Sequence, residues 1–325
     1  NMSKVSKGVF TTCKKNDNCP PWELASEEII HDKNKRTINY KNAWLKLYDK
    51  PVFYFPKFFH PDPSVKRQSG FLIPTLKDSG NTGASIITPY YKVLSVNKDF
   101  TLKPRIFVNK NLLIQNEYRQ VEKNLDHIID FGLFTSELNN KNESSKSHIF
   151  SNTNIELKND LFDNTTLELN LEQVSHDTYL KKFQPKSDLI KSEYLMHSFL
   201  KLDGYNENSN LVVEFEVFED LTKSTSDRYE FVYPNVKYSK EFEYDSIPGS
   251  FNLSSNFYQS QFSTNKYTKS LLTDLIYSAD TKFSDVGMVK DFQVLLKNPN
   301  KINKTGSNNE SDTDSKLLTK LMYTL

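Results

Sequence analysis

Residues 56–73 read PKFFHPDPSVKRQSGFLI and mark a change in the pattern of the chain. Before them, short extended segments are separated by turns; after them, long segments alternate regularly between apolar and polar residues. Such a contrast is typical of a boundary between two β architectures. We therefore expect a small β domain over residues 1–65 and a larger one over residues 66–325.

Alternation with a period of two residues dominates the C-terminal region and predicts strands with one apolar and one polar face. In residues 165–173, three leucines alternate with three polar residues: Leu167, Leu169 and Leu171 with Glu168, Asn170 and Glu172. Segments 100–108, 211–218 and 251–257 repeat the pattern. Each segment is near the ~10 residues that a tilted membrane strand requires.

Two all-β folds satisfy this alternation. In a soluble β-sandwich the polar faces lie in water, whereas in an outer-membrane β-barrel the apolar faces contact lipid and the polar faces line a wet lumen. The number and length of the segments favour the barrel, because the strands of soluble proteins average ~5–6 residues.

The composition argues against several function classes. The 42 basic and 41 acidic residues nearly cancel, so the chain lacks the electrostatic footprint of a nucleic-acid-binding protein. Only 9 glycines are present, which argues against a Gly-rich nucleotide-binding scaffold. The chain also lacks H-E-x-x-H, G-x-S-x-G and P-loop motifs. We therefore expect no enzyme, no cofactor and no metal site.

The two ends of the chain show no typical terminal signals. The N-terminus lacks a charged region followed by an apolar region, so no signal peptide is visible. The C-terminus follows shortly after a polar run at residues 303–316. We interpret the chain as an internal fragment of a longer protein.

The boundary segment and several others occur in an order that is familiar from one family. The boundary itself contributes residues 60–74 (HPDPSVKRQSGFLIP). The other segments are 10–13 (FTTC), 20–25 (PPWELA), 51–56 (PVFYFP), 88–91 (TPYY), 99–105 (DFTLKPR), 116–119 (NEYR), 175–180 (SHDTYL), 227–229 (DRY) and 233–236 (YPNV). Together they resemble the LptD family over about residues 8 to 290. This family, also called OstA or organic solvent tolerance protein, assembles lipopolysaccharide in the Gram-negative outer membrane.

The resemblance implies a fold and a function. The fold would be the end of a periplasmic β-jelly roll, followed by an incomplete antiparallel transmembrane β-barrel. The function would be transport of lipopolysaccharide to the outer leaflet, without bond chemistry. The implied partners are lipopolysaccharide, an LptE-like lipoprotein plug, an LptA-like periplasmic bridge protein and the outer membrane. Two alternatives remain open: a secreted carbohydrate-binding β-sandwich, and an outer-membrane porin or receptor unrelated to lipopolysaccharide.

Prolines near the start of the second region are candidates for a lateral gate. The resemblance places Pro74 inside the first long strand and Pro89 inside the second, and Pro104 lies in the third. Proline has no N–H, so each removes a hydrogen bond from the ladder and would weaken the strands through which the lipid leaves. The alternative is that these prolines only mark edge or bulge positions.

Cys13 and Cys19 are the only cysteines. Two thiols cannot complete a zinc site, and their spacing is not that of a C-x-x-C redox pair. In an oxidising periplasm we expect disulfides. The two could pair with each other, or one or both could pair with cysteines of the C-terminal barrel outside this chain, as the resemblance implies.

Two further sets of residues are candidates for contact with the transported lipid. Apolar residues of the first region would line its acyl-chain groove: Trp22, Leu24, Ile30, Ile38, Trp44, Leu45, Leu47, Val52 and Phe53. Charged residues of the second region would face the lumen: Lys103, Arg105, Glu117, Arg119, Glu168, Glu172, Glu214 and Glu216. The alternatives are that the first set forms an ordinary sandwich core and that the second only solvates a wet interior.

Overall fold

The computed structural model describes residues 2–11, 22–80, 82–135, 145–223, 227–263, 266–283, 289–304 and 311–324. Nearly all elements are antiparallel strands, and one short helix is present among these residues. The predicted all-β fold is therefore confirmed. Within the described part of the chain, no helix has the length and apolar character needed to cross a membrane. The chain divides into two compact units, residues 1–70 and residues 71–325.

The first unit is a four-stranded antiparallel sheet in the order β1–β2–β3–β4. Its strands are β1 (Met2–Phe10), β2 (Trp22–Asp32), β3 (Thr37–Leu47) and β4 (Lys50–Pro61). The buried core consists of Leu24, Tyr40 and Ala43. Six partly buried side chains pack around it: Phe10, Ile29, Ile38, Leu45, Phe55 and Phe58.

These four strands are longer than the short segments that the sequence predicted. The β1–β2 and β2–β3 ladders each skip one residue pair, and the skipped positions lie in one row across the sheet. This row contains Lys7 in β1 and Asn42 in β3, whose φ angles are positive, at 52° and 51° respectively. The apolar alternation changes phase at this row: Tyr40 lies before it in β3 and Ala43 after it, yet both belong to the same core. The phase change interrupts the period-two pattern without ending the strand, so one strand looks like two short ones in the sequence.

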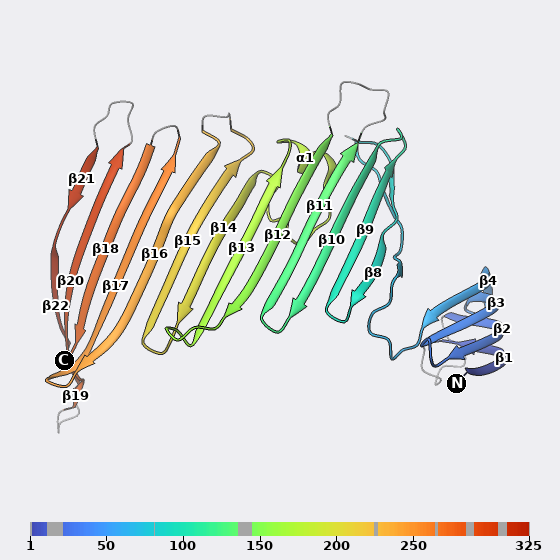
Figure 1. Cartoon of the computed structure of the whole chain (residues 1–325), viewed down its shortest axis with the longest axis horizontal. Helices are drawn as coiled ribbons and strands as arrows, with labels where there is room; N and C mark the ends of the chain where they lie inside the picture. The colour runs from blue at the N-terminus through green and yellow to red at the C-terminus, as the bar shows by residue number, and fades with distance from the viewer. Residues whose placement is uncertain are drawn as a thin grey trace. The chain divides into compact units, whose positions relative to one another are not determined.

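The second unit is a single large antiparallel sheet, shown in Figure 1. Its long strands pair in chain order: β9 (Lys98–Phe107), β10 (Leu112–Glu122), β11 (Leu125–Thr135), β12 (Lys146–Leu157), β13 (Asn164–Val174), β14 (Leu195–Tyr205), β15 (Ser209–Asp220), β16 (Tyr229–Tyr244), β17 (Ile247–Phe262), β18 (Lys266–Ser278) and β20 (Val289–Lys304). The short strands β19 (Lys282–Phe283), β21 (Asp312–Ser315) and β22 (Leu318–Thr324) pair with β20.

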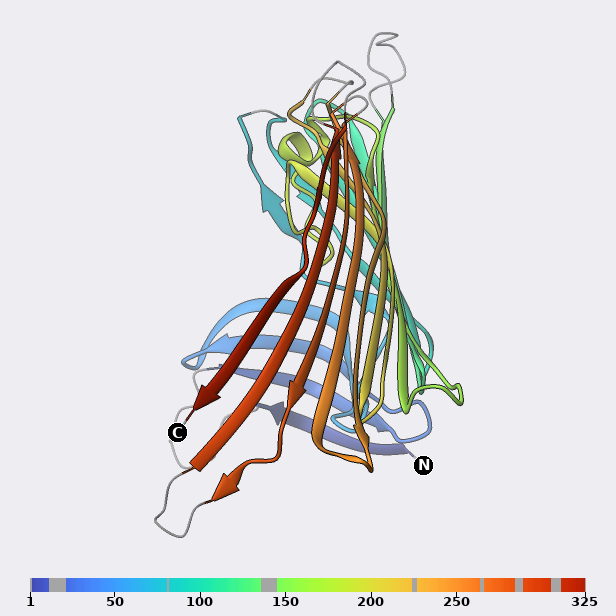
Figure 2. The same cartoon turned by 90° about the vertical axis from the view of Figure 1, so that its left-hand side faces the viewer.

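Whether this sheet closes into a barrel depends on whether its first and last strands pair with each other. The strand order can be written as a ring in which β22 adjoins β5. Among the described residues, the residue pairs of β22 are with β20 alone, and Figure 1 draws β22 and β8 on opposite sides of the unit, while Figure 2 gives a side view of the same strands. We therefore describe the unit as an antiparallel sheet whose strand order is that of a ring, without residue pairs described between β22 and β5.

The first strands of this unit differ from the sequence prediction. Instead of two long strands, the chain forms four short ones: β5 (Gly70–Phe71), β6 (Thr75–Lys77), β7 (Ser85–Ile87) and β8 (Tyr90–Ser95). Pro74 lies between β5 and β6, and Pro89 lies between β7 and β8. The prolines therefore separate strand pieces rather than lying inside long strands, because proline cannot donate to a ladder.

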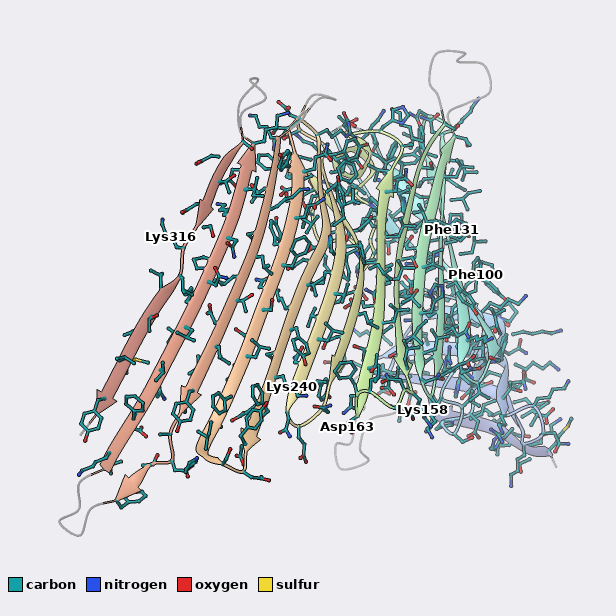
Figure 3. The ribbon with its side chains drawn as sticks, turned by 60° about the vertical axis from the view of Figure 1, so that its left-hand side comes forward. Phe100, Phe131, Lys158, Asp163, Lys240 and Lys316 are labelled. Atoms are coloured by element: carbon teal, nitrogen blue, oxygen red, sulfur yellow. The ribbon has the colours of Figure 1, made fainter. Side chains whose placement is uncertain are left out.

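The two faces of the sheet differ in polarity. Residues that pair across antiparallel strands share a face. One row across four strands is polar: Glu168, Lys201, Glu214 and Asn235. The adjacent row is apolar: Leu167, Leu202, Val213 and Val236. We call the face that carries the first row the polar face; Figure 3 shows the side chains of both faces, with Lys158, Asp163 and Lys240 toward the lower strand ends.

Candidate functional site

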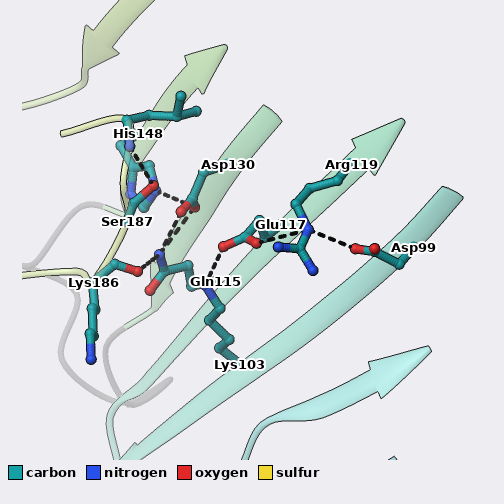
Figure 4. Close-up of polar contacts among 10 residues, drawn as sticks. Asp99, Lys103, Gln115, Glu117, Arg119, Asp130, His148, Lys186 and Ser187 are labelled. Atoms are coloured by element: carbon teal, nitrogen blue, oxygen red, sulfur yellow. Dashed lines mark hydrogen bonds and ion pairs between the residues drawn. The ribbon is translucent and has the colours of Figure 1, made fainter. Parts of the chain in front are cut away.

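Three of the predicted lumen residues lie together on the polar face of β9 and β10. The Lys103 Nζ atom is 2.6 Å from Glu117 Oε2, and the Arg119 Nε atom is 2.8 Å from Asp99 Oδ1. Arg119 is also 3.6 Å from Glu117 Oε1, so the charges form one continuous network (Figure 4). The strand register explains the proximity, because Glu117 pairs with Thr101 and Arg119 with Asp99. These charges are neutralised by one another rather than isolated.

Arg105, another predicted lumen residue, has a different environment. Its side chain is only 3% exposed. The guanidinium donates to Ser85 Oγ at 2.9 Å and to the Phe183 carbonyl at 2.6 Å, and it lies 4.6 Å from the centre of the Phe107 ring. A buried charge needs such partners, since an unpaired one is costly. Arg105 therefore connects parts of the protein that are distant in sequence.

The other four predicted glutamates lie on the polar face of β13 and β15 and bind protein groups. The Glu172 carboxylate accepts the backbone N–H of His197 at 3.0 Å, and Glu216 lies 2.8 Å from the ring of the same histidine. Glu168 accepts a hydrogen bond from Asn152 at 3.1 Å. Glu214 accepts one from Asn235 at 2.8 Å. The polar face is thus a hydrogen-bonded surface across several strands.

A segment that sequence reasoning did not single out covers one end of the polar face. This α1 segment, residues 175–194, connects β13 to β14 and contains the helix α1 (Tyr179–Phe183), which Figure 1 shows at the upper strand ends. Three buried helix residues form an apolar cap: Tyr179, Leu180 and Phe183. They pack in one cluster with inward residues of the strands: Phe107, Leu113, Phe134, Phe150, Val174, Met196 and Leu221. The only sequence signal was the family resemblance of residues 175–180.

A buried polar network anchors the cap to the sheet. The His148 ring bridges the Tyr179 hydroxyl, 2.9 Å from Nδ1, and Asp130 Oδ1, 3.1 Å from Nε2. Gln115 donates to both Asp130 oxygens and to the Lys186 carbonyl (Figure 4). Burial raises the pKa of the Tyr179 hydroxyl, so the hydroxyl remains protonated and neutral. Both ring nitrogens of His148, both Asp130 oxygens and the Gln115 amide nitrogen thereby have partners, as a buried site requires.

Gly132 is the residue that makes room for this network. A Cβ atom at this position would lie 2.4 Å from His148 Cε1 and 3.1 Å from the Tyr179 hydroxyl. The histidine ring therefore occupies the space above a glycine of the neighbouring strand.

Pro89 and Pro104 form a row of incomplete pairs across the first strands. Leu72 donates its backbone N–H to the Pro89 carbonyl at 2.8 Å, and Thr88 donates to the Pro104 carbonyl at 3.1 Å. A hydrogen-bonded antiparallel pair normally exchanges two such bonds. Neither proline has an N–H to donate in return. Both connections in this row are thus made by one hydrogen bond instead of two.

The predicted groove residues of the first unit divide into two groups. Leu24 is buried and Ile38 packs against the same core, while the Trp22 ring lies 6.1 Å from that of Phe10. The Phe53 ring contacts Phe55 at 4.7 Å, although Phe53 remains 56% exposed.

Leu45 also packs against this core, whereas Trp44, Leu47 and Val52 do not. Trp44 contacts Tyr54 instead, with ring centres 4.9 Å apart, and both Trp44 and Leu47 are exposed. Cys13 and Cys19 lie outside the described residues. Within the described ranges, no group of three or more His, Cys, Asp or Glu side chains could hold a metal ion.

Comparison with known proteins gives a partial match. No family model matches the chain. The chain is 37% identical over 115 residues to a Yersinia pestis protein and to a Yersinia enterocolitica protein, each named LPS-assembly protein LptD; the match covers 35% of this chain and 14% of each relative. A Pseudomonas savastanoi protein of the same name is 34% identical over 143 residues, which are 44% of this chain and 15% of that protein. The matched part thus spans about 14–15% of the relatives' length. The resemblance to the LptD family is thereby confirmed: over part of its length, this chain is a homologue of proteins named LPS-assembly protein LptD.

Proposed function

We propose that this chain is part of an outer-membrane protein that transports lipopolysaccharide to the outer leaflet. The observation that carries the proposal is its similarity to three proteins named for lipopolysaccharide assembly. The structure supports it with a sheet whose two faces suit lipid and water respectively. This role requires passage of a lipid and no bond-making chemistry.

The length and polarity of the strands support insertion into a membrane. The strands from β9 to β18, together with β20, contain 10 to 16 residues each. A tilted membrane strand needs about 9–11 residues. Apolar side chains such as Phe131, Leu169 and Phe215 are 41–46% exposed on the face opposite the polar one. We therefore assign the apolar face to lipid and the polar face to a lumen through which the sugar portion passes.

The incomplete pairs at Pro89 and Pro104, together with the strand break at Pro74, support a lateral gate at Pro74 and Pro89. In a membrane an unmade backbone hydrogen bond has no water to replace it and costs several kcal/mol. The strands β5 to β8 are therefore the weakest part of the sheet. We propose that they separate to let lipid A move sideways into the membrane, while the sugar portion remains in the lumen.

The first unit would supply the lipid from the periplasm. Leu24 and Ile38 belong to its apolar core, and the rings of Trp22 and Phe53 contact core side chains, which is the chemistry that acyl chains need. An LptA-like bridge protein would deliver the lipid to this unit, and an LptE-like lipoprotein would bind the polar face from the lumen. The disulfide role of Cys13 and Cys19 remains a prediction.

Site-specific photo-crosslinking tests the transport function. A photoreactive amino acid is placed at Phe53 and, separately, at Ile73, which is 88% exposed next to Pro74. In living Gram-negative cells, both positions should form adducts with lipopolysaccharide. Lys158, in the turn between β12 and β13, is the matched control and should form none.

Two other outcomes would contradict the proposal. Adducts with small sugars alone would favour a carbohydrate-binding protein, and no adducts would favour a porin or receptor. A separate measurement tests the membrane assignment: a barrel should need detergent for extraction and should migrate differently on gels after heating. Full solubility without detergent would exclude it.

A further inference from the structure

The C-terminal end of α1 is held by two cations from other strands. The last carbonyls of a helix have no partner within the helix. Here the Phe183 carbonyl accepts a hydrogen bond from Arg105 Nη1 at 2.6 Å, and the Gln184 carbonyl accepts one from Lys77 Nζ at 3.2 Å. Arg105 belongs to β9 and Lys77 to β6. The helix end is therefore hydrogen-bonded to β9 and to the short strand β6.

Ser85 extends this connection to β7. Its hydroxyl oxygen accepts a hydrogen bond from Arg105 Nε at 2.9 Å and donates to the Lys77 carbonyl at 3.1 Å. Both Ser85 and Arg105 are at most 5% exposed, so water does not compete strongly for these bonds. We call Arg105, Ser85, Lys77 and the two carbonyls of α1 the Arg105 node.

Arginine suits this node for a geometric reason. Its guanidinium presents five N–H donors in a fixed planar fork, so Nε and Nη1 can bind two acceptors at once. The Phe107 ring, 4.6 Å from the guanidinium carbon, adds a further contact. A lysine at this position would have a single charged nitrogen and would lose the fork.

The node lies where the backbone ladder is weakest. β6 and β7 have three residues each. Pro74 separates β6 from β5, and Pro89 separates β7 from β8. Strands this short gain little from backbone hydrogen bonds alone, and the row next to Arg105 is itself incomplete at Pro104. The position of β6 and β7 therefore depends on side chains to an unusual degree.

We propose that Arg105 is a positioning residue of the gate: it holds β6 and β7 against α1 and β9, so that this side of Pro74 and Pro89 stays closed while β5 and β8 separate. The prolines then act as hinges between a fixed part and a moving part. As a gate assignment, the inference rests on the proposed function. The structural part, that the node fixes β6 and β7, can be measured without lipopolysaccharide.

Distances between spin labels test this assignment in the full chain, reconstituted in lipid bilayers. One pair joins Leu76 on β6 to Leu133 on β11, and the reference pair joins Leu94 on β8 to Leu133; all three side chains are exposed. In Arg105→Ala, the narrow Leu76–Leu133 distance peak should be lost and replaced by a broad distribution. The Leu94–Leu133 distribution should not change.

Arg119→Ala is the matched control, because Arg119 lies on the same face but pairs with Asp99 and Glu117 instead of α1. It should leave both distributions unchanged. If Arg105→Ala does not fold, Ser85→Ala removes the link to β7 and should give the same selective broadening. An unchanged Leu76–Leu133 peak, or equal broadening of both pairs, overturns the assignment. Neither result affects the photo-crosslinking test of lipopolysaccharide transport.

Discussion

The two edges of β9 differ although they belong to one strand. On one edge, β10 pairs without interruption from Gln120 opposite Lys98 to Leu112 opposite Ile106. On the other edge, two short strands, β7 and β8, share the space, and the ladder lacks regular pairs around Pro104. One edge is thus held by its backbone, whereas the other depends on side chains.

The difference shows how one sheet can combine a part with an uninterrupted ladder and a part with an interrupted ladder. The strands beyond β10 gain further stability because the apolar cap packs on Phe134 and Phe150. The weak edge, with the interrupted ladder, is bonded to the same cap, but through the Arg105 node. Changes to the cap should therefore reduce overall stability, while changes at the prolines or the node should alter local opening.

The largest effect should come from Phe134→Ala. Phe134 is 2% exposed, and its ring lies 4.3 Å from that of Phe183. Truncation leaves a cavity between the sheet and the cap and should lower the free energy of unfolding by about 3–5 kcal/mol. Urea unfolding of the protein in lipid bilayers measures the change. Phe131→Ala, on the other face of the same strand, is the control; a loss as large as that of Phe134→Ala would contradict a packed cap.

A smaller loss should follow from Gly132→Ala. The new Cβ would lie 2.4 Å from His148 Cε1, so the ring must move away from Asp130 and Tyr179. We expect the free energy of unfolding to fall by about 1–3 kcal/mol, measured in the same unfolding experiment. Gly70→Ala meets no atom within 4 Å and serves as the control. A neutral Gly132→Ala would show that the buried network does not constrain the ring.

Restoring the ladder should strengthen the weak edge. Pro89→Ala supplies an N–H that can be donated back toward Leu72, and Pro74→Ala allows β5 and β6 to join. Each new hydrogen bond should contribute about 0.5–1.5 kcal/mol. Hydrogen exchange at the Leu72 amide should slow, and in cells lipopolysaccharide should reach the surface more slowly.

The control for the proline variants is Pro299→Ala, in the middle of the long strand β20. It changes a proline of the same sheet away from the proposed gate, so it should leave the export rate unchanged. An unchanged rate in the double variant Pro74→Ala with Pro89→Ala would refute the gate role of these prolines.

The smallest effect should come from Arg228→Ala. Arg228 Nη2 is 2.8 Å from Asp177 in the α1 segment and 2.6 Å from Glu219 in β15. Asp177 is 48% exposed, and such ion pairs contribute about 0–1 kcal/mol. Unfolding at low and high salt should show a small difference that salt removes. Lys223→Ala, which removes an exposed pair with Asp220, is the comparison; a loss above about 2 kcal/mol for Arg228→Ala would indicate a larger anchoring role.

Many strands of the second unit could be predicted from the local alternation of apolar and polar residues. The strands around Leu167, Leu169 and Leu171 were correctly predicted because one side of each strand is polar and the other is not. Lys103, Glu117 and Arg119 were predicted as lumen residues, and the structure brings their side chains into contact on one face. Arg105 occupies a polar position of the same alternating segment as Lys103, yet its side chain is buried. Alternation shows to which face a side chain points, but not what covers that face.

The first unit shows a second limit of the sequence pattern. Its strands were predicted as short because the apolar phase shifts at the row of Lys7 and Asn42. Trp44 and Leu47 were grouped with Leu24 by composition, but the structure leaves both exposed. The sequence alone does not show at which row the apolar alternation shifts. It therefore cannot assign the residues before and after that row to one face.

The sequence by itself determined the all-β class, the polar and apolar faces of the long strands and the relation to the LptD family. These properties depend on period-two alternation and on short segments, both of which are local. Only the tertiary structure placed the α1 segment over the polar face and brought Lys77, Ser85 and Arg105 to the same helix end. Those contacts join residues up to 107 positions apart, and they depend on strand register, which no local pattern specifies across so many strands.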